Sequence, residues 1–545
     1  MGARVLHRGV TTLAALVVLA GLLLPNMLGG FTVLSFFRIP VEAIIGTATL
    51  LLLGPSRPAR VRRLLPAFVG AALGLMTVLK LLDVAFDAIY KRPFDLVLDW
   101  SLLDEGRSFL HDSLGPTGAI GVVVGTLILV ILLPMVMTWA VVRLDRVLTR
   151  HGAAAAGGTL VLGTVWLLCA ALGVRNTSGP IAASSSVEFL QDRVEQVRSG
   201  LRDQEEFARA SADDGFAGVP TEQLLTRLRG KDVLFAFIES YGRSAVQDPE
   251  LGPPVSALLA ERDRRLRAAG WTSRSAFLTS PTYGGGSWLA HSTFSSGLWI
   301  DNQQRYRTLT SGDRMTLTGA FRETGDWRTV GIMPGVTRSW PEGKFYGLDH
   351  VYDAGGMGYK GPKFSWTPVP DQYSLSAFER LEHGKPDRGP MMAKIILASS
   401  HNPWAPLPRT LGWNEIGDGS VYDAIEKEGK DPAEVWKDPA KVRAEYRKSI
   451  EYSLTSLLTY VEKYGDENTV LVFLGDHQPV STVTRDKLGR DVPITVLARD
   501  PAVLDRISEW GWQPGLKPGP DAPVWRMDAF RDRFLSAYGD RPAAP

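Results

Sequence analysis

Cysteine is almost absent from this chain of 545 residues, which contains only Cys169. A single cysteine excludes a disulfide framework and a zinc site built from several cysteines. Net charge is also small, because 60 lysines and arginines are balanced by 58 aspartates and glutamates. The chain therefore lacks the strong positive charge of a general nucleic-acid-binding protein. Internal repeats and low-complexity tracts are missing too, and 45% hydrophobic with 22% charged residues is a globular composition that argues against disorder.

Long apolar runs are present, and they are concentrated before residue 175. About 20 apolar residues are needed for a helix to cross the hydrocarbon core of a membrane. The second run is the weakest, because it is short and contains Glu42. Lys80 and Asp83, near the end of the third run, could be functional, as ionisable groups in membranes often are, but a snorkelling pair at the outer interface is the favoured interpretation. The runs predict a five-span transmembrane domain over residues 1–175, with spans near 12–30, 39–53, 64–82, 113–142 and 153–174.

Arginine clusters support this count of spans. They lie at residues 4–8, 57–63 and 143–150, which five spans place on one side of the membrane. The loop at 90–114 is rich in acidic residues and falls on the other side. Cytoplasmic loops are the ones that carry excess lysine and arginine. An odd number of spans therefore places everything after residue 175 outside the cytoplasm.

The remainder of the chain has the pattern of a water-soluble α/β protein. Residues 176–230 predict a helical linker, and residues 231–545 predict a separate domain. Helical patterns separate the apolar runs of this domain, most clearly at 442–464. This alternation favours a central, mostly parallel sheet with helices on both faces. The predicted strands are 233–238, 329–333, 394–398, 470–474 and 492–497.

Acids and histidines follow three of these predicted strands. Glu239 follows the first, His401 comes three residues after the third, and Asp476 and His477 follow the fourth. In open α/β sheets, ligands bind beyond the carboxyl ends of the strands. Any one of these residues alone could cap a helix or fill a loop. Together, carboxylates and imidazole at one sheet edge favour a site for a divalent cation such as Mn²⁺ or Zn²⁺.

A glycine-rich segment supplies a candidate nucleophile, Ser287, directly after Gly284, Gly285 and Gly286. Glycines let the backbone approach a ligand closely. A hydroxyl placed after them would lie at the start of a helix, where negative charge is stabilised. Contact with a metal would lower the pKa of this hydroxyl and activate it for attack on an ester.

The ordered motifs Ile-Glu239-Ser, Gly-Gly-Ser287, Ser-Ser-His401-Asn-Pro and Gly-Asp476-His477 resemble those of lipoteichoic acid synthase and its sulfatase-like relatives in the alkaline phosphatase superfamily. The resemblance implies a fold of the alkaline phosphatase and sulfatase type for residues 231–545. It implies that Glu239, Asp476, His477 and Ser287 contact one divalent metal, with Mn²⁺ expected and Zn²⁺ or Mg²⁺ as alternatives. Ser287 stands where the synthases have a threonine nucleophile, and His401 corresponds to a histidine on the substrate side.

The resemblance also implies a reaction and a location. Phosphoglycerol would move from phosphatidylglycerol, through a covalent phospho-serine intermediate, to a hydroxyl group of a glycolipid or a growing polymer. Arg338 and Trp340 are candidates for substrate binding. The enzyme would lie in a bacterial cell membrane with its catalytic domain outside the cytoplasm, and nucleic acid is not expected as a partner.

Other functions remain open on the sequence. A phosphoethanolamine transferase or a phosphodiesterase would use the same groups. A sulfatase is disfavoured, because no formylglycine precursor motif surrounds Ser287. A non-catalytic sensor or partner of a cell-wall enzyme belongs to a different class, and loss of Glu239, Asp476 or His477 would favour it. All three are present.

Overall fold

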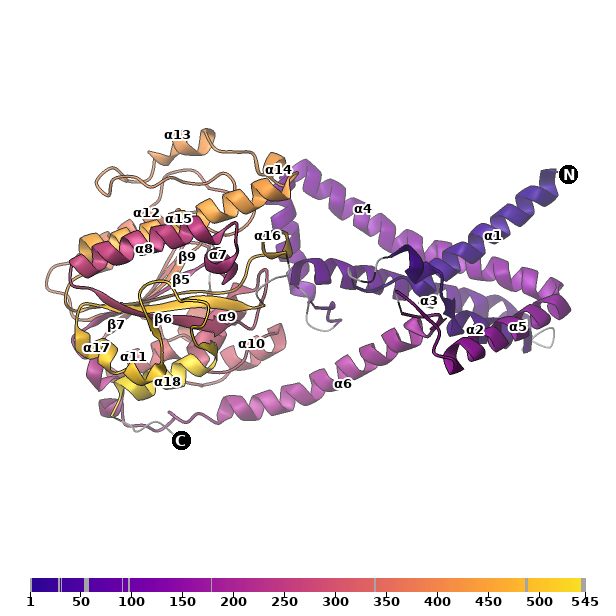
Figure 1. The fold of residues 1–545 in the computed structure, drawn as a ribbon, viewed down its shortest axis with the longest axis horizontal. Coiled ribbons are helices and arrows are strands. Elements are labelled where there is room, and N and C mark those ends of the chain that lie inside the picture. Colours follow the sequence, from indigo (N-terminus) through magenta and orange to yellow (C-terminus); the bar gives the residue numbers. More distant parts are fainter. Residues whose placement is uncertain are drawn as a thin grey trace. The chain divides into compact units, whose positions relative to one another are not determined.

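The chain forms two compact units in a computed structural model (Figure 1). The N-terminal unit comprises residues 1–100 and 117–202, and the α/β unit comprises residues 101–116 and 203–545. The residues that the structure describes are 2–27, 30, 32–52, 58–90, 92–96, 99–177, 179–337, 340–485 and 489–540.

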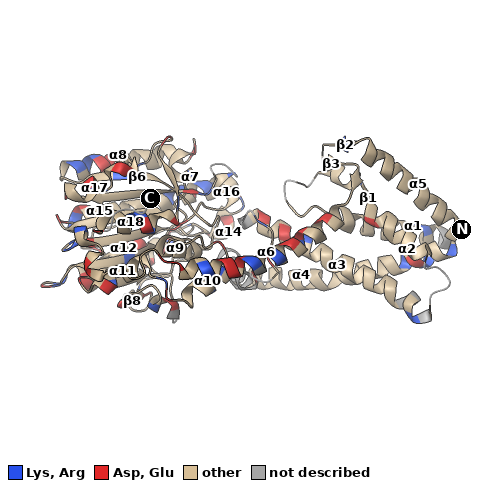
Figure 2. Ribbon diagram, turned by 90° about the horizontal axis from the view of Figure 1, so that it is seen from below, with Lys and Arg blue, Asp and Glu red and all other residues tan. Residues whose placement is uncertain are grey.

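Apolar helices dominate the N-terminal unit. In the described part of the chain, four helical segments are long and apolar enough to cross a membrane: Val5–Leu23, Leu64–Ala88, Gly115–Arg150 and Gly152–Ala171. Figure 2 shows α5 without charged residues, whereas α6 carries both signs. The helices are α1 (Gly2–Leu23), α2 (Val41–Leu52), α3 (Ala59–Tyr90), α4 (Trp100–Arg150, not helical at Gly115), α5 (Gly152–Ala171) and α6 (Ser185–Ala212).

Helix α2 falls where the second span is predicted, and it has 12 residues. Twelve helical residues extend about 18 Å, against a hydrocarbon core of about 30 Å. Residues 53–57, which follow α2, lie outside the described residues. The count of five spans thus stays a prediction.

Lys80 and Asp83 of α3 bind different partners, so their sequence-based interpretation as a pair at the interface is wrong. Lys80 is 1% exposed, and its Nζ donates to the carbonyl oxygens of Gly21 (3.3 Å) and Leu22 (3.0 Å) at the end of α1. Asp83 is buried in an ion pair with Arg193 of α6. Both charges therefore have polar partners inside this unit, as buried charges require.

A mixed sheet forms the centre of the α/β unit. In the described residues it has nine strands in the order β12-β6-β11-β10-β5-β9-β7-β8, with β13 also paired to β6. The stretch from β10 to β8 is parallel, whereas β11 is antiparallel to both β10 and β6. The strands are β5 (Asp232–Ile238), β6 (Thr272–Thr279), β7 (Arg328–Met333), β8 (His350–Asp353), β9 (Met391–Leu397), β10 (Thr469–Gly475), β11 (Asp491–Ala498), β12 (Gln513–Pro514) and β13 (Val524–Arg526).

Strand β5 shows why its sequence is a continuous apolar run. Leu234, Ala236 and Ile238 join one hydrophobic core, and the alternate residues Val233, Phe235 and Phe237 join the other. Both faces of the strand are buried, which is the usual state of a central parallel strand.

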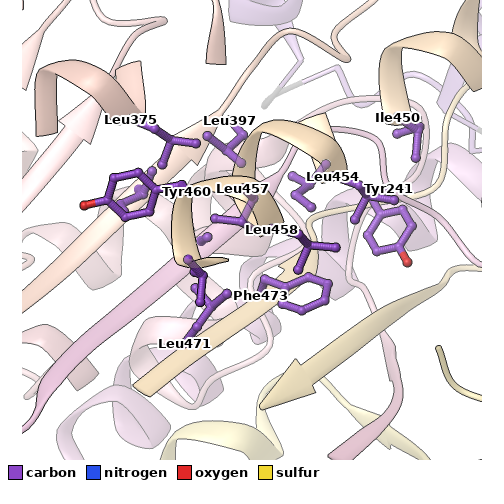
Figure 3. Close-up of a cluster of buried hydrophobic side chains, with 14 of the residues drawn as sticks. Tyr241, Leu375, Leu397, Ile450, Leu454, Leu457, Leu458, Tyr460, Leu471 and Phe473 are labelled. Carbon is purple, nitrogen blue, oxygen red and sulfur yellow. The ribbon is translucent and has the colours of Figure 1, made fainter. Parts of the chain in front are cut away.

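Helices cover both faces of the sheet (Figure 1). Helix α15 is the longest on the first face, and Figure 3 shows its Leu454, Leu457 and Leu458 among side chains of neighbouring strands. Asp438 caps this helix by accepting from the N–H of Ala440. Residues of α7 (Ser244–Gln247), α8 (Gly252–Ala268), α12 (Asp371–Phe378) and α15 (Pro439–Tyr464) contribute to the first core. Residues of α9 (Ser287–Ser296), α11 (Leu317–Thr324), α17 (Pro501–Asp505) and α18 (Ala529–Tyr538) contribute to the second.

Candidate metal centre and nucleophile

Strand register brings the predicted ligands to one edge of the sheet. Gly475 of β10 pairs with Ile238 of β5, and Ile238 pairs with Leu397 of β9. The three neighbouring strands run parallel, so their carboxyl ends lie side by side. Glu239 and Asp476 each come directly after a paired strand end, and these positions are therefore adjacent in space.

Glu239, Asp476 and His477 form a buried cluster, with one ligand atom from each within 4.8 Å of the others. His477 Nε2 lies 3.1 Å from Glu239 Oε1 and 3.9 Å from Asp476 Oδ1. At its other ring nitrogen, His477 Nδ1 is 2.8 Å from the carbonyl oxygen of Gln478. A hydrogen bond from Nδ1–H to this carbonyl directs the Nε2 lone pair toward the carboxylates, which is the arrangement of a metal-binding histidine.

The three side chains of the cluster shift one another's pKa values. Burial opposes ionisation of Glu239, but the His477 imidazole outweighs it and holds the pKa of Glu239 well below its usual value. Burial, followed by the negative charge of Glu239, raises the pKa of Asp476 to about 8. Burial opposes protonation of His477, yet the two carboxylates raise its pKa to about 9. The two carboxylates thus concentrate negative charge in the cluster, and the raised pKa values of Asp476 and His477 favour bound protons that compensate it.

This donor set fits a divalent cation. Two carboxylates, an imidazole and a hydroxyl are ligands that Mn²⁺, Zn²⁺ and Mg²⁺ accept. Asp476 Oδ2 is buried and has no hydrogen-bond partner among the described residues. Ligands must lose their protons to bind metal, so a cation would displace the protons that the raised pKa values indicate.

Ser287 lies at the first position of α9 and contacts the cluster. Its Oγ donates to Glu239 Oε2 at 2.8 Å and lies 3.2 Å from His477 Nε2. Gly286 caps the helix with a φ of 77°, in the left-handed region that glycine adopts most readily. The preceding loop is fixed by a hydrogen bond from Gly284 N to the carbonyl of Gln478, 2.9 Å long. The backbone conformation of Gly286 and the hydrogen bond of Gly284 together position the Ser287 hydroxyl.

Backbone contacts that the sequence analysis missed hold the ligands in place. Ser240, at a φ of 57°, donates its N–H to Asp476 Oδ1 at 2.8 Å. His477 N donates to the same oxygen at 2.7 Å. The Ser400 hydroxyl donates to the carbonyl oxygen of Glu239 at 2.6 Å. The serines beside Glu239 and His401 in the sequence were the available signal, but their roles depend on strand pairing.

His401 follows β9, at the sheet edge where Glu239 and Asp476 lie. It is close enough to Glu239 for its charge to favour the ionised carboxylate. Its ring stacks on Trp366, with centroids 4.0 Å apart and planes 17° apart. Trp366 lies in the long loop before α12, and sequence analysis gave it no role. The stack fixes the orientation of the imidazole beside the cluster.

Trp340 and Arg338 were predicted as substrate-binding residues. Trp340 is half-buried and stacks on Tyr346 at a centroid distance of 5.4 Å. Tyr346 in turn shares a hydrogen bond with Ser292 of α9, 2.6 Å long. Trp340 thus connects through Tyr346 to α9, the helix that begins at Ser287. Arg338 lies outside the described residues, and both roles stay predictions.

Solved structures similar to this chain include a lipoteichoic acid synthase and a phosphoglycerol transferase. The lipoteichoic acid synthase LtaP from Listeria monocytogenes matches at 14% identity and a TM-score of 0.37, over 58% of this chain and 74% of that one. The Streptococcus pyogenes phosphoglycerol transferase GacH, in complex with sn-glycerol-1-phosphate, matches at 13% identity and a TM-score of 0.36, over 63% and 81%. The zinc complex of the periplasmic domain of EptC from Escherichia coli matches at 13% identity and a TM-score of 0.38, over 57% and 83%.

No protein-family model and no curated protein sequence matches the chain. At these identities and TM-scores, the reaction has to be inferred from the residues of the site itself.

Proposed function

We propose that this protein is a membrane-anchored, metal-dependent phosphotransferase that moves phosphoglycerol from a phosphatidylglycerol-like lipid to a hydroxyl acceptor. The observation that carries the proposal is the position of Ser287 Oγ, which is 2.8 Å from Glu239 and 3.2 Å from His477. A serine hydroxyl at a helix start, in contact with a buried carboxylate–imidazole cluster, is the arrangement of an activated nucleophile.

In the first step, Ser287 Oγ forms a bond to phosphorus while the bond from phosphorus to the diacylglycerol oxygen breaks. As the new bond forms, the hydroxyl proton moves to the Glu239 carboxylate, which already accepts a hydrogen bond from it. The start of α9 favours the negative charge on the phosphoryl oxygens. A divalent cation held by Glu239, Asp476 and His477, expected to be Mn²⁺ with Zn²⁺ or Mg²⁺ as alternatives, would supply positive charge to these oxygens.

His401 completes the first step. Its ring is held beside the cluster by Trp366, and an imidazole there can protonate the departing diacylglycerol oxygen. The product is diacylglycerol, and phosphoglycerol remains bonded to Ser287 as a phosphodiester. Arg338 and Trp340 are proposed to contact the phosphoglycerol group.

In the second step, a hydroxyl of a glycolipid or growing polymer attacks the phospho-serine. A new bond from the acceptor oxygen to phosphorus forms, the bond from phosphorus to Ser287 Oγ breaks, and Glu239 returns to Oγ the proton that it took in the first step. The acceptor proton can leave through His401, which now acts as the base. Water in place of the acceptor would convert the same site into a phosphodiesterase.

The apolar helices agree with a lipid donor. The four segments of the described residues that are long and apolar enough to span a membrane would keep the chain at the surface where phospholipid headgroups lie. We propose that the α/β unit lies outside the cytoplasm of a bacterial cell.

The test uses the full-length chain in detergent micelles with Mn²⁺ and fluorescent phosphatidylglycerol. We expect diacylglycerol release that EDTA abolishes and added Mn²⁺ restores. Release from phosphatidylethanolamine but not from phosphatidylglycerol would identify a phosphoethanolamine transferase instead. No release from either lipid by metal-loaded protein would overturn the proposal of lipid phosphotransfer.

A further inference from the structure

His291 lies one helical turn after Ser287, on the same helix α9. Its side chain is 12% exposed, and its Nε2 is buried without a hydrogen-bond partner among the described residues. This nitrogen is 3.8 Å from Asp476 Oδ2, which also lacks a partner. Two unsatisfied polar atoms that face each other in a buried site call for a physical explanation, because each unmade hydrogen bond costs free energy.

The two oxygens of Asp476 have different surroundings. Oδ1 already accepts from the backbone N–H groups of Ser240 and His477. Oδ2 therefore remains to bind a cation. A carboxylate oxygen has two lone pairs, so Oδ2 can bind a metal with one and accept a hydrogen bond with the other.

The imidazole of His291 packs against strand β5. Phe237, the last aromatic residue of β5, packs against the imidazole at a centroid distance of 4.4 Å. His291 is not part of the group of ligand atoms that lie within 4.8 Å of one another. The imidazole thus reaches Asp476 from outside the set formed by Glu239, Asp476 and His477.

We propose that His291 is a positioning residue for the metal centre, whose Nε2–H donates to Asp476 Oδ2 and holds this carboxylate in its metal-binding orientation. The inference rests on the metal-dependent function proposed above. A small closure of the 3.8 Å gap would make the hydrogen bond. Partners of this kind orient ligands, and their loss commonly weakens metal binding by about 10 to 100-fold.

The chain offers a matched control at the opposite end of β5. His383 Nε2 is buried without a hydrogen-bond partner among the described residues, and it lies 3.6 Å from Asp232 Oδ2. Asp232 begins β5, whereas Glu239 follows its end. The two histidine–aspartate pairs are thus alike in burial and distance, and only one of them adjoins the proposed metal centre.

The experiment measures the Kd for Mn²⁺ of the full-length chain in detergent, by competition with a fluorescent chelator. We expect His291→Ala to raise the Kd about 10 to 100-fold. His291→Gln, which keeps an N–H near the position of Nε2, should recover most of the affinity. His383→Ala should leave the Kd within about twofold of the wild-type value, because its partner Asp232 lies at the other end of the strand.

Thermal unfolding in EDTA shows whether each variant is folded. If His291→Ala does not fold, His291→Leu, which fills similar volume without a donor, replaces it. An unchanged Kd in the folded variant would overturn the inference and leave the proposed function intact. Two ions per wild-type chain and one in the variant would make His291 a ligand of a second metal, which also overturns it. If the wild-type protein bound Zn²⁺ or Mg²⁺ in place of Mn²⁺, the same variants would be compared with that ion. Wild-type protein that binds none of the three ions would overturn the proposed metal-dependent function itself.

Discussion

At the scale of single residues, the proposed chemistry depends on one oxygen, Ser287 Oγ. Ser287→Ala removes the nucleophile, so we expect diacylglycerol release to fall at least about 1,000-fold. Glu239, Asp476 and His477 remain, so Mn²⁺ should still bind. Single-turnover assays with radiolabelled donor should trap a labelled wild-type protein and leave the variant unlabelled.

Ser292 gives the control for this change. It lies on the same helix. Its buried hydroxyl forms hydrogen bonds with the carbonyl oxygen of Trp288 and the hydroxyl of Tyr346, and not with the proposed metal ligands. Ser292→Ala should therefore retain labelling and turnover. Equal turnover in wild type and Ser287→Ala would disprove the role of Ser287.

Asp371 of α12 carries a second residue-scale prediction, this one about stability. Burial raises its pKa to about 6 despite hydrogen bonds from Ser453 and Ser399. The unfolded chain loses this proton near pH 4, so the folded state binds more protons between about pH 4 and 6. Stability from this group is therefore complete below about pH 4 and declines as pH rises through 6. The full loss is about 3 kcal/mol, since one pKa unit corresponds to about 1.4 kcal/mol.

Asp371→Asn removes the titration and keeps the shape of the side chain. We expect the variant to unfold at a higher temperature than wild type at pH 8 and to show a flatter pH dependence between 4 and 7. Thermal unfolding across this range measures both effects. A wild-type protein more stable at pH 7 than at pH 4.5 by an amount that Asp371→Asn abolishes would show that the sign is wrong.

Individual site residues differed in how far the sequence could predict them. Glu239, Asp476 and His477 were predictable as neighbours because each follows an apolar strand, and parallel strands end at one edge. Ser240 was not, because its contact with Asp476 requires a left-handed backbone that its sequence does not signal. Trp366 was missed because only the path of a long loop stacks it on His401.

At the scale of elements, the start of α9 determines where Ser287, the proposed nucleophile, lies. Gly286 adopts a φ of 77°, and an added Cβ would lie 3.4 Å from Thr282 Cγ2. Gly286→Ala should therefore cost about 1 kcal/mol of stability, since an L side chain disfavours this region. Relief of the strain would shift Ser287, so we also expect a loss of diacylglycerol release.

Gly325 separates the two effects of this change. It ends α11 at a φ of 73°, and a Cβ there would meet no atom within 4 Å. Gly325→Ala should lower the unfolding temperature by a similar amount and leave the initial rate of diacylglycerol release unchanged. If Gly286→Ala behaved in the same way as this control, α9 would not depend on Gly286 to position Ser287.

Elements themselves were predictable when their sequence matched their burial. The strand at Asp232–Ile238 has all seven residues buried, and a continuous apolar run announced it. Strand β6, with the sequence TSRSAFLT, was missed because its first half is polar. The antiparallel direction of β11 could not be predicted either, because an apolar run does not indicate whether its strand lies parallel or antiparallel to its neighbours.

At the scale of the whole molecule, the division into an apolar helical unit and an α/β unit follows from composition. The exact extent of the units was harder to predict from the sequence. The segment 101–116 belongs with the α/β unit, although it directly precedes an apolar helical segment long enough to span a membrane. The break at Gly115, with φ 71° and ψ 173°, marks this division inside α4. Gly115 is one glycine beside a long apolar run, and its presence alone does not predict a break in the helix.

The side of the membrane on which the α/β unit lies depends on whether the number of spans is odd. Cys169→Ser gives a background without cysteine, since the chain has no other. His151, between α4 and α5, and Lys385, in the α/β unit, are both exposed positions for a new cysteine. Five spans place His151 with the cytoplasmic arginine clusters and Lys385 outside. In intact cells, a membrane-impermeant maleimide should therefore label Lys385→Cys and spare His151→Cys until the membrane is permeabilised. Labelling of His151→Cys alone would place the proposed catalytic site in the cytoplasm, where an outward-facing phosphoglycerol acceptor could not reach it.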